Sequence, residues 1–250
     1  MELECVAYRT KDGVATITLN RPEKRNPLSR RVFAELSQCL DEAAADVSVA
    51  ALIITGGDKV FCAGMDIAEM MEFGPEDTYP FWNTGYNLIF EKICNFRVPT
   101  IAAVSGYALA GGFDLAVCCD FRVASETAKF GQLEVNVGLS PGIDRLWRLV
   151  GMSRAKHLGL TCDIIDATEA YRIGLVDKIV DVEELAGEAV ALAAKFVTKP
   201  REALERSKQS YLNVVNMDHQ AAINWETQLL CRLFDSDQRR EIMARFLRKE

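Results

Sequence analysis

Residues 99–120 read PTIAAVSGYALAGGFDLAVCCD, and this stretch decides the fold class of the chain. The apolar run at 99–104 predicts a strand that is buried on both faces, as in a sheet covered by helices. This strand ends at Gly106, and a helix is predicted to begin near Gly111. A turn from strand to helix built from such small residues leaves backbone N–H groups free to point at a ligand.

A second turn of the same kind lies at residues 61–67, which read FCAGMDI and follow another apolar run at 50–55. Two N–H groups that converge on one oxygen form an oxyanion hole, a large rate-enhancing device in acyl chemistry. Two carboxylates, Asp114 and Glu134, follow the later turn. Taken singly, Asp114 is also explained as a helix cap and Glu134 as a solvated surface residue. Together with the turns, they indicate an enzyme that polarises a carbonyl and moves protons beside it.

Strands and helices alternate in the first part of the chain, and from about Gly142 the pattern is nearly all helical. The alternation predicts a right-handed superhelical α/β core of β-β-α units. We expect this core over residues 1–190 and a helical region over 191–250 that packs on it or on a neighbouring subunit. Further strands are predicted at 5–8, 14–19, 121–124 and 175–179, and helices at 29–45, 66–71, 78–94, 143–150, 153–160, 167–171, 182–197, 200–215, 219–234 and 236–247.

Composition excludes several classes of function. The net charge of −7 and the lack of a basic run argue against a nucleic-acid binder. The eight cysteines include no C-x-x-C pair, which favours buried thiols in a reducing cytoplasm. The two histidines, His157 and His219, have no metal-ligand spacing, so we expect no metal site. No apolar run approaches the length of a membrane span, and no signal-peptide pattern is present.

One motif is misleading. Residues 138–142, GLSPG, match the G-x-S-x-G pattern of hydrolase nucleophile elbows. That elbow requires a backbone N–H on the residue after the serine, and here the residue is Pro141, which has none. We therefore interpret the segment as a turn, without a catalytic role for Ser140.

With these residues in view, the chain resembles the crotonase, or enoyl-CoA hydratase/isomerase, superfamily over almost its whole length. The resemblance implies a crotonase-like α/β fold, a spiral of β-β-α units with a C-terminal helical trimerisation region. It also implies an acyl-CoA thioester substrate, no cofactor beyond the coenzyme A of that substrate, and a homotrimer or dimer of trimers. The matching segments are residues 20–29, 61–70, 99–120, 129–142 and 174–176.

The resemblance also implies roles for individual residues. The N–H groups of Met65 and Gly111 would hold the thioester oxygen. Glu134 matches one catalytic glutamate of the family, and Asp114 stands in the place of the other. The residues expected to contact coenzyme A are Arg25, Ala63, Asp66 and Ile67, together with Phe246 and Lys249 of a neighbouring subunit.

The sequence departs from the family pattern near the acyl group. Asp114 is one methylene shorter than the usual glutamate, and the loop at 141–146 is about two residues shorter than usual. Asp144 is an added acid near the site, for which an ion pair with Arg145 or Arg148 is the simpler explanation. Trp82, Tyr86 and Phe90 recur at helical spacing and fit either core packing or the wall of a pocket for a broad acyl group.

We therefore expect a lyase similar to enoyl-CoA hydratase that adds water across the C2=C3 double bond of an unsaturated acyl-CoA. Two alternatives stay open at this point. An isomerase would use Glu134 alone to move a proton between carbons, and a catalytically silent scaffold would bind coenzyme A without turnover.

Overall fold

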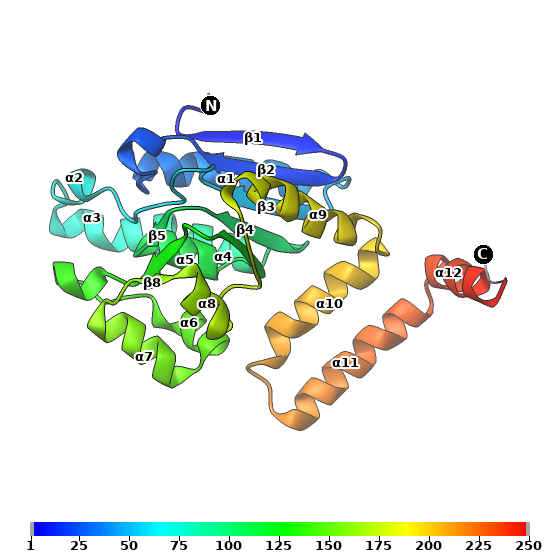
Figure 1. The fold of residues 1–250 in the computed structure, drawn as a ribbon. Coiled ribbons are helices and arrows are strands. Elements are labelled where there is room, and N and C mark those ends of the chain that lie inside the picture. Colours follow the sequence, from blue (N-terminus) through cyan, green and yellow to red (C-terminus); the bar gives the residue numbers. More distant parts are fainter. Residues whose placement is uncertain (1–2, 249–250) are drawn as a thin grey trace.

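The computed structural model of the chain describes residues 3–248, apart from the side chains of Ile143 and Phe246. Its centre is a six-stranded sheet with the strand order β1-β2-β3-β4-β6-β9 (Figure 1). Neighbouring strands are parallel, except for the antiparallel β1–β2 hairpin, whose turn contains Asp12 and Gly13. The strands are β1 (Val6–Lys11), β2 (Val14–Leu19), β3 (Ala51–Thr55), β4 (Thr100–Val104), β6 (Phe121–Ser125) and β9 (Lys178–Val180).

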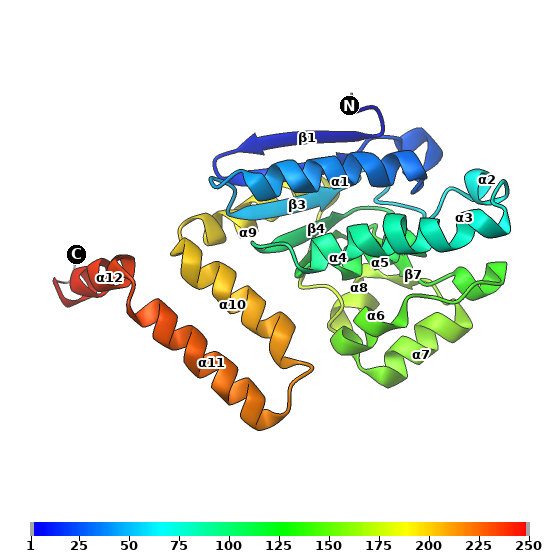
Figure 2. The ribbon, with the colours of Figure 1, turned by 180° about the vertical axis from the view of Figure 1, so that it is seen from behind.

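The central strands are buried on both faces, as their unbroken apolar runs predicted. Leu52 and Ile54 of β3 point into the main core, whereas Ile53 points to the other face and joins a second cluster. That second cluster is closed by the helix α9 (Leu185–Val197), through Leu185, Ala189 and Ala193. Figures 1 and 2 show α9 on one face of the sheet and the helices α1 (Arg30–Ala45) and α4 (Leu88–Cys94) on the other.

A second, smaller sheet has the order β5-β7-β8 and was not predicted from the sequence. Its strands are β5 (Tyr107–Leu109), β7 (Lys129–Gly131) and β8 (Ile165–Asp166). The chain passes from β4 in the large sheet to β5 in the small sheet and then into the helix α5 (Gly111–Val117). This path is one β-β-α unit, so the architecture is the crotonase-like spiral that the resemblance implied.

The predicted helices are present, with shifted ends. The helix expected at 78–94 begins earlier and consists of α3, a π-helical segment (Phe81–Asn87) and α4 in direct succession. The strand expected at 175–179 occupies Lys178–Val180 instead. The helices before the C-terminal region are α1 (Arg30–Ala45), α2 (Ile67–Met70), α3 (Pro75–Pro80), α4 (Leu88–Cys94), α5, α6 (Ile143–Val150), α7 (Met152–Thr161), α8 (Ala167–Arg172) and α9, with short 3-10 turns at Pro22–Lys24, Glu134–Val137 and Val182–Glu184.

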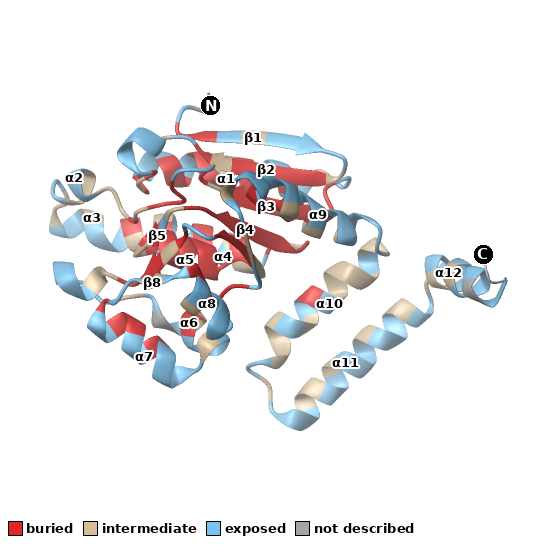
Figure 3. Cartoon of the chain, in the orientation of Figure 1, coloured by how far each residue is buried: buried red, intermediate tan, exposed pale blue. Residues whose placement is uncertain are grey.

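Three helices, α10 (Arg201–Val214), α11 (His219–Phe234) and α12 (Asp237–Arg248), extend away from the sheet (Figure 1). Figure 3 shows buried residues concentrated around the sheets, whereas α11 and α12 are largely exposed. No helix within residues 3–248 is both long and apolar enough to cross a membrane.

Candidate active site

Backbone pairing fixes the first glycine-flanked turn. Leu28 donates to Gly64 O at 2.8 Å and accepts from the Asp66 N–H at 2.8 Å, which makes a parallel bridge to Met65. In this pattern Leu28 binds the two neighbours of Met65, so the Met65 N–H points to the opposite side. The amide for which an oxyanion role was predicted is thus turned away from the strand-like contact with Leu28.

The second turn is joined to the first by a similar bridge. Cys62 donates to Tyr107 O and accepts from the Leu109 N–H, both at 2.9 Å. A Cβ placed on Gly64, whose φ of +106° favours glycine, would lie 3.0 Å from Ala110 Cβ and 3.5 Å from Gly111 N. The two turns therefore pack closely together at Gly64 and Gly111, which are 47 positions apart in sequence.

Ala110 holds an unusual conformation at the start of α5, with φ 48° and ψ −125°. Its N–H donates to Gly131 O at 2.8 Å, which ties the turn to the small sheet. A backbone held in such a sparsely populated region costs a non-glycine residue of order 1–3 kcal/mol, and residues of this kind cluster at functional sites. The bend makes Gly111 the first residue of α5, where an amide has no partner within its own helix.

Asp114 lies in the first turn of α5 and is only 3% exposed. Its carboxylate is held from both sides, because the Tyr86 hydroxyl donates to Oδ2 and Gln132 Nε2 donates to Oδ1 at 3.3 Å. Burial, together with the negative charge of Glu134, raises the pKa of Asp114 to about 7. The Asp114 carboxyl can therefore gain or lose a proton near neutral pH.

Glu134 begins the 3-10 turn that follows β7. Its side chain is half-buried, and burial raises its pKa above the ordinary value. Its Oε2 is buried and has no hydrogen-bond partner among the described residues. Two carboxyl groups with raised pKa values, close enough for one charge to act on the other, are typical of acid–base catalysis.

The loop that follows Glu134 returns to Asp114. A Cβ placed on Gly142 would lie 3.1 Å from Asp114 Oδ2, and Gln132 Nε2 donates to Gly142 O at 3.1 Å. Ser140, in the same loop, is exposed and appears in none of the contacts to Asp114. Gly142 thus covers one side of the carboxylate.

The structure places most of the residues predicted to contact coenzyme A near the first turn. Ala63 N donates to Arg25 O at 3.0 Å, and Arg25 itself has a left-handed backbone with φ 65°. Asp66 caps α2 by accepting from Glu69 N at 3.4 Å, and Ile67 is 66% exposed. Phe246 belongs to α12, but its side chain is not described, and Lys249 lies outside the described residues.

Two residues of the site were not assigned a role from the sequence. Tyr86 was expected only to pack in the core or to line an acyl pocket, and Gln132 lies in the matching segment 129–142 without a predicted role of its own. The sole signal for Tyr86 was its helical spacing with Trp82 and Phe90, which contact its ring at centroid distances of 4.9 Å and 4.1 Å. Phe90 is fully buried, so of the two predicted alternatives core packing is the correct one for that residue.

Asp144, the other acidic residue near the site, is paired with a residue outside the site. Asp144 forms an ion pair with Arg148 at 3.2 Å, one of the two pairings expected. Arg145 is paired with Glu91 instead. Asp144 is therefore accounted for by its surface ion pair.

Comparison with known proteins agrees with the fold. The model of the family described as "Enoyl-CoA hydratase/isomerase" matches residues 9–250. A β-β-α spiral with two facing glycine turns and two acids defines the class as crotonase-superfamily enzymes. The chain belongs to the enoyl-CoA hydratase/isomerase family.

Individual relatives are similar over their full length. The short-chain-enoyl-CoA hydratase of Clostridium acetobutylicum and the crotonyl-CoA hydratase of Syntrophomonas wolfei are each 39% identical, covering 100% of this chain and 97% of the relative. The crystal structure of an enoyl-CoA hydratase from Bacillus anthracis superposes with a TM-score of 0.94 at 31% identity, covering 99% of this chain and 97% of that one.

Proposed function

We propose that this protein is a hydro-lyase that adds water across the C2=C3 double bond of a short-chain α,β-unsaturated acyl-CoA. The observation that carries the proposal is the contact of the two glycine turns beside two carboxyl groups of raised pKa, Asp114 and Glu134. Relatives that are 39% identical over the whole chain carry the names short-chain-enoyl-CoA hydratase and crotonyl-CoA hydratase, which supports the substrate class.

The N–H groups of Met65 and Gly111 hold the thioester oxygen in this proposal. When oxygen adds to C3, negative charge develops on the thioester oxygen as an enolate forms. Fixed donors aimed at that oxygen stabilise the charge without reorganising, and loss of one such donor costs about 3 kcal/mol. Within residues 3–248, the bridge to Leu28 and the start of α5 leave these two amides without a backbone acceptor, which supports the assignment.

The two acids divide the proton transfers. Asp114 takes a proton from the attacking water as its oxygen bonds to C3, and Glu134 delivers a proton to C2. The base must be ionised, so the pKa of about 7 for Asp114 fits a base that works near neutral pH. The unpaired Oε2 of Glu134 supports its role as the donor, because no group in the described part of the chain forms a hydrogen bond with that atom.

An isomerase is the second candidate, and one observation favours it. Both oxygens of Asp114 accept hydrogen bonds from protein donors, as expected of a residue that only supports the fold. In that case Glu134 alone would carry a proton between carbons. A carboxylate has about four lone-pair sites, however, so two bonds leave room for a water.

Coenzyme A would lie along the first turn. We assign Arg25, Ala63, Asp66 and Ile67 to its binding, and Phe246 and Lys249 of a neighbouring subunit to its far side. The exposed Ile67 and the backbone contact between Arg25 and Ala63 support a surface open to a ligand there. We assign no metal and no cofactor apart from the coenzyme A of the substrate, and no nucleic-acid partner. The free state of the eight cysteines supports a cytoplasmic location.

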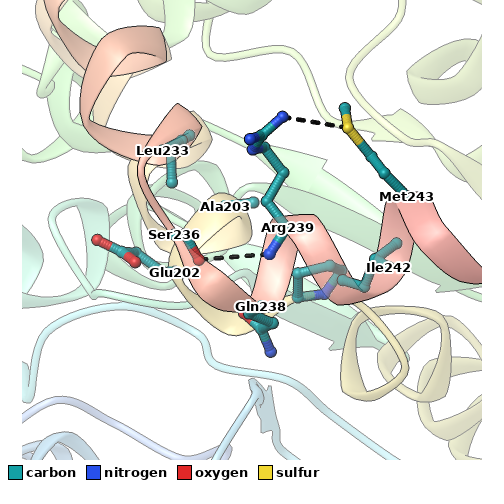
Figure 4. Close-up of a pocket in the computed structure, with 9 residues that line it drawn as sticks. Glu202, Ala203, Leu233, Ser236, Gln238, Arg239, Ile242 and Met243 are labelled. Atoms are coloured by element: carbon teal, nitrogen blue, oxygen red, sulfur yellow. Dashed lines mark hydrogen bonds between the residues drawn. The ribbon is translucent and has the colours of Figure 1, made fainter.

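We further assign the C-terminal helices to a homotrimer or a dimer of trimers. The helix α11 has no buried residue, and its Leu230 and Phe234 are 63% and 59% exposed. α12 lies across the ends of α10 and α11 and lines an open apolar hollow of about 290 Å³ next to Ala203, Leu233 and Ile242 (Figure 4). Apolar side chains left exposed along a helix without a buried residue support burial against another copy. Light scattering should give a trimer or hexamer mass, and Leu230→Asp should lower it.

A direct assay tests the activity. Purified protein is mixed with crotonyl-CoA, and the loss of absorbance from the conjugated thioester is followed while mass spectrometry detects the hydrated product. Product heavier by one water supports a hydratase. A shifted double bond at unchanged mass supports the isomerase, and no turnover with linear or cyclic unsaturated CoA esters contradicts both.

A further inference from the structure

We propose that Tyr86 is a positioning residue for the hydration step. Its phenol donates a hydrogen bond to Oδ2 of the shorter acid Asp114 and so holds that carboxylate in its catalytic position. The inference rests on the proposed function and adds a residue to it. Tyr86 comes from the helical run before β4, 28 positions before Asp114 in sequence, and the two side chains meet in the buried interior.

The ring of Tyr86 is fixed, so its hydroxyl has a defined place. Phe90 and Trp82 contact it edge-on at 4.1 Å and 4.9 Å between centroids, and Phe33 does so at 6.2 Å. Its Cε2 is 3.5 Å from the position of a Cβ on Gly111. The same ring therefore lies against the glycine whose N–H is assigned to the oxyanion hole and reaches the acid three residues further on.

The carboxylate of Asp114 is bounded on three sides. Tyr86 donates to Oδ2, Gln132 donates to Oδ1, and the Cα of Gly142 faces Oδ2 closely enough that an added Cβ would be 3.1 Å away. An aspartate with no such contacts has free rotation about two side-chain torsions. Because an error of about 1 Å in the place of a catalytic group can cost about a hundredfold in rate, these contacts bear directly on turnover.

Tyr86 acts as the donor in this pair. Burial and the charge of Asp114 hold the pKa of the Tyr86 phenol well above its ordinary value, so the phenol keeps its proton. The bond also favours the ionised carboxylate and lowers the pKa of Asp114 against the raising effects of burial and of Glu134. Gln132 and Arg145 also lower the pKa of Asp114. Cys118 raises the pKa of Tyr86.

The test removes only the phenol oxygen. Tyr86→Phe keeps the ring packing, and Tyr79→Phe makes the same change on the preceding helix at a residue that is 75% exposed. We expect Tyr86→Phe to lower kcat for hydration by about tenfold to a hundredfold, with KM nearly unchanged. The acid limb of the pH profile of kcat/KM should move up by about one pH unit, because the ionised Asp114 loses a donor. Tyr79→Phe should match the wild type.

Two further measurements separate positioning from general destabilisation. In an Asp114→Asn background, Tyr86→Phe should cause no further loss of hydration, because its partner acid is already absent. Carbon-13 NMR of aspartate-labelled protein, with the Asp114 signal assigned from Asp114→Asn, should show its titration moved to higher pH by Tyr86→Phe. A wild-type rate and pH profile for Tyr86→Phe, or an equal loss in the Asp114→Asn background, overturns the proposal.

Failure of the proposed function is a separate outcome. If the wild-type protein hydrates no unsaturated acyl-CoA, the hydratase assignment fails, and the NMR titration alone decides the contact with Tyr86. An unmoved Asp114 signal in Tyr86→Phe then overturns the positioning role, and a moved signal supports it.

Discussion

Gly112 packs directly on the backbone of Cys62, so closely that a Cβ on Gly112 would lie 2.2 Å from Cys62 O. The two residues belong to the two turns that carry the assigned oxyanion amides. Cys62 O already accepts the Leu109 N–H, so it cannot move aside without breaking that bridge. Only a residue without a side chain allows α5 to begin this close to the first turn.

Gly112→Ala is therefore expected to disrupt the fold around the site. Overpacking against backbone, unlike overpacking against a flexible side chain, has no easy relief, and we expect a loss of about 3 kcal/mol or more in the free energy of unfolding. Chemical denaturation followed by circular dichroism measures it. Gly187→Ala in α9 is the matched control, because a Cβ there meets nothing within 4 Å, and it should be neutral or slightly stabilising. Equal stability of the two variants would contradict the close approach.

Glu134→Gln is expected to abolish most of the hydration activity while the protein stays folded. The amide keeps the size of the side chain but cannot deliver a proton to C2, and loss of general acid catalysis costs about a hundredfold to ten-thousandfold in kcat. Stopped-time assays with crotonyl-CoA measure the effect. Deuterium exchange at C2 of a saturated acyl-CoA should fall in parallel, and unimpaired exchange and turnover in Glu134→Gln would remove Glu134 from the mechanism.

The large sheet was predictable because its signal is local. The unbroken apolar runs of β3 and β4 reflect burial on both faces, and the side chains of Leu52 and Ile53 do point into two different cores. The small sheet was not predictable in this way. Its strands are two or three residues long, too short for a periodic pattern, and β5 is contained in the glycine-flanked segment that was interpreted as a turn.

Part of the site was likewise beyond local patterns. The glycines and acids stand out by residue type, so Gly111, Asp114 and Glu134 could be singled out from the sequence. The bond from Tyr86 to Asp114 joins residues on separate helical elements, and nothing in the spacing of Trp82, Tyr86 and Phe90 tells which of them meets the acid. Such a partner is set by tertiary packing, which a single sequence does not display.

Asp114→Asn should make the protein less active and, at neutral and alkaline pH, more stable. The pKa of Asp114 is about 7 in the folded chain and near 3.8 without burial, so the folded state keeps a proton that the unfolded state releases. Between those two values the wild type loses about 1.4 kcal/mol of stability per pH unit from this group, and above pH 7 the loss is complete. The asparagine of the variant does not ionise, so the variant does not show this loss of stability with rising pH.

The difference in unfolding free energy between Asp114→Asn and the wild type should thus rise from pH 4 to about pH 7 and then level off. Urea titrations at several pH values measure it. A pH-independent difference would mean that Asp114 is not the titrating group. Activity provides the second readout: hydration should collapse in the variant, whereas an isomerase that depends on Glu134 alone should retain most of its rate.

Gly142→Ala probes the cover over Asp114 without touching either acid. The backbone at Gly142, with φ −75° and ψ 95°, suits any residue, so the change adds no backbone strain. The new methyl group would lie 3.1 Å from Asp114 Oδ2 and push the carboxylate by a few tenths of an ångström. We expect kcat for hydration to fall by about tenfold, because proton transfer depends on the place of the base, while the melting temperature changes little.

Ser140→Ala, in the same loop, is the matched control. Ser140 is exposed, and its G-x-S-x-G context lacks the amide that a nucleophile elbow requires, so this variant should keep the wild-type rate. Steady-state kinetics of both variants, with thermal unfolding beside them, measure the contrast. A full loss of turnover in Ser140→Ala would restore the serine as a nucleophile, and an unchanged rate in Gly142→Ala would show that the loop does not constrain the acid.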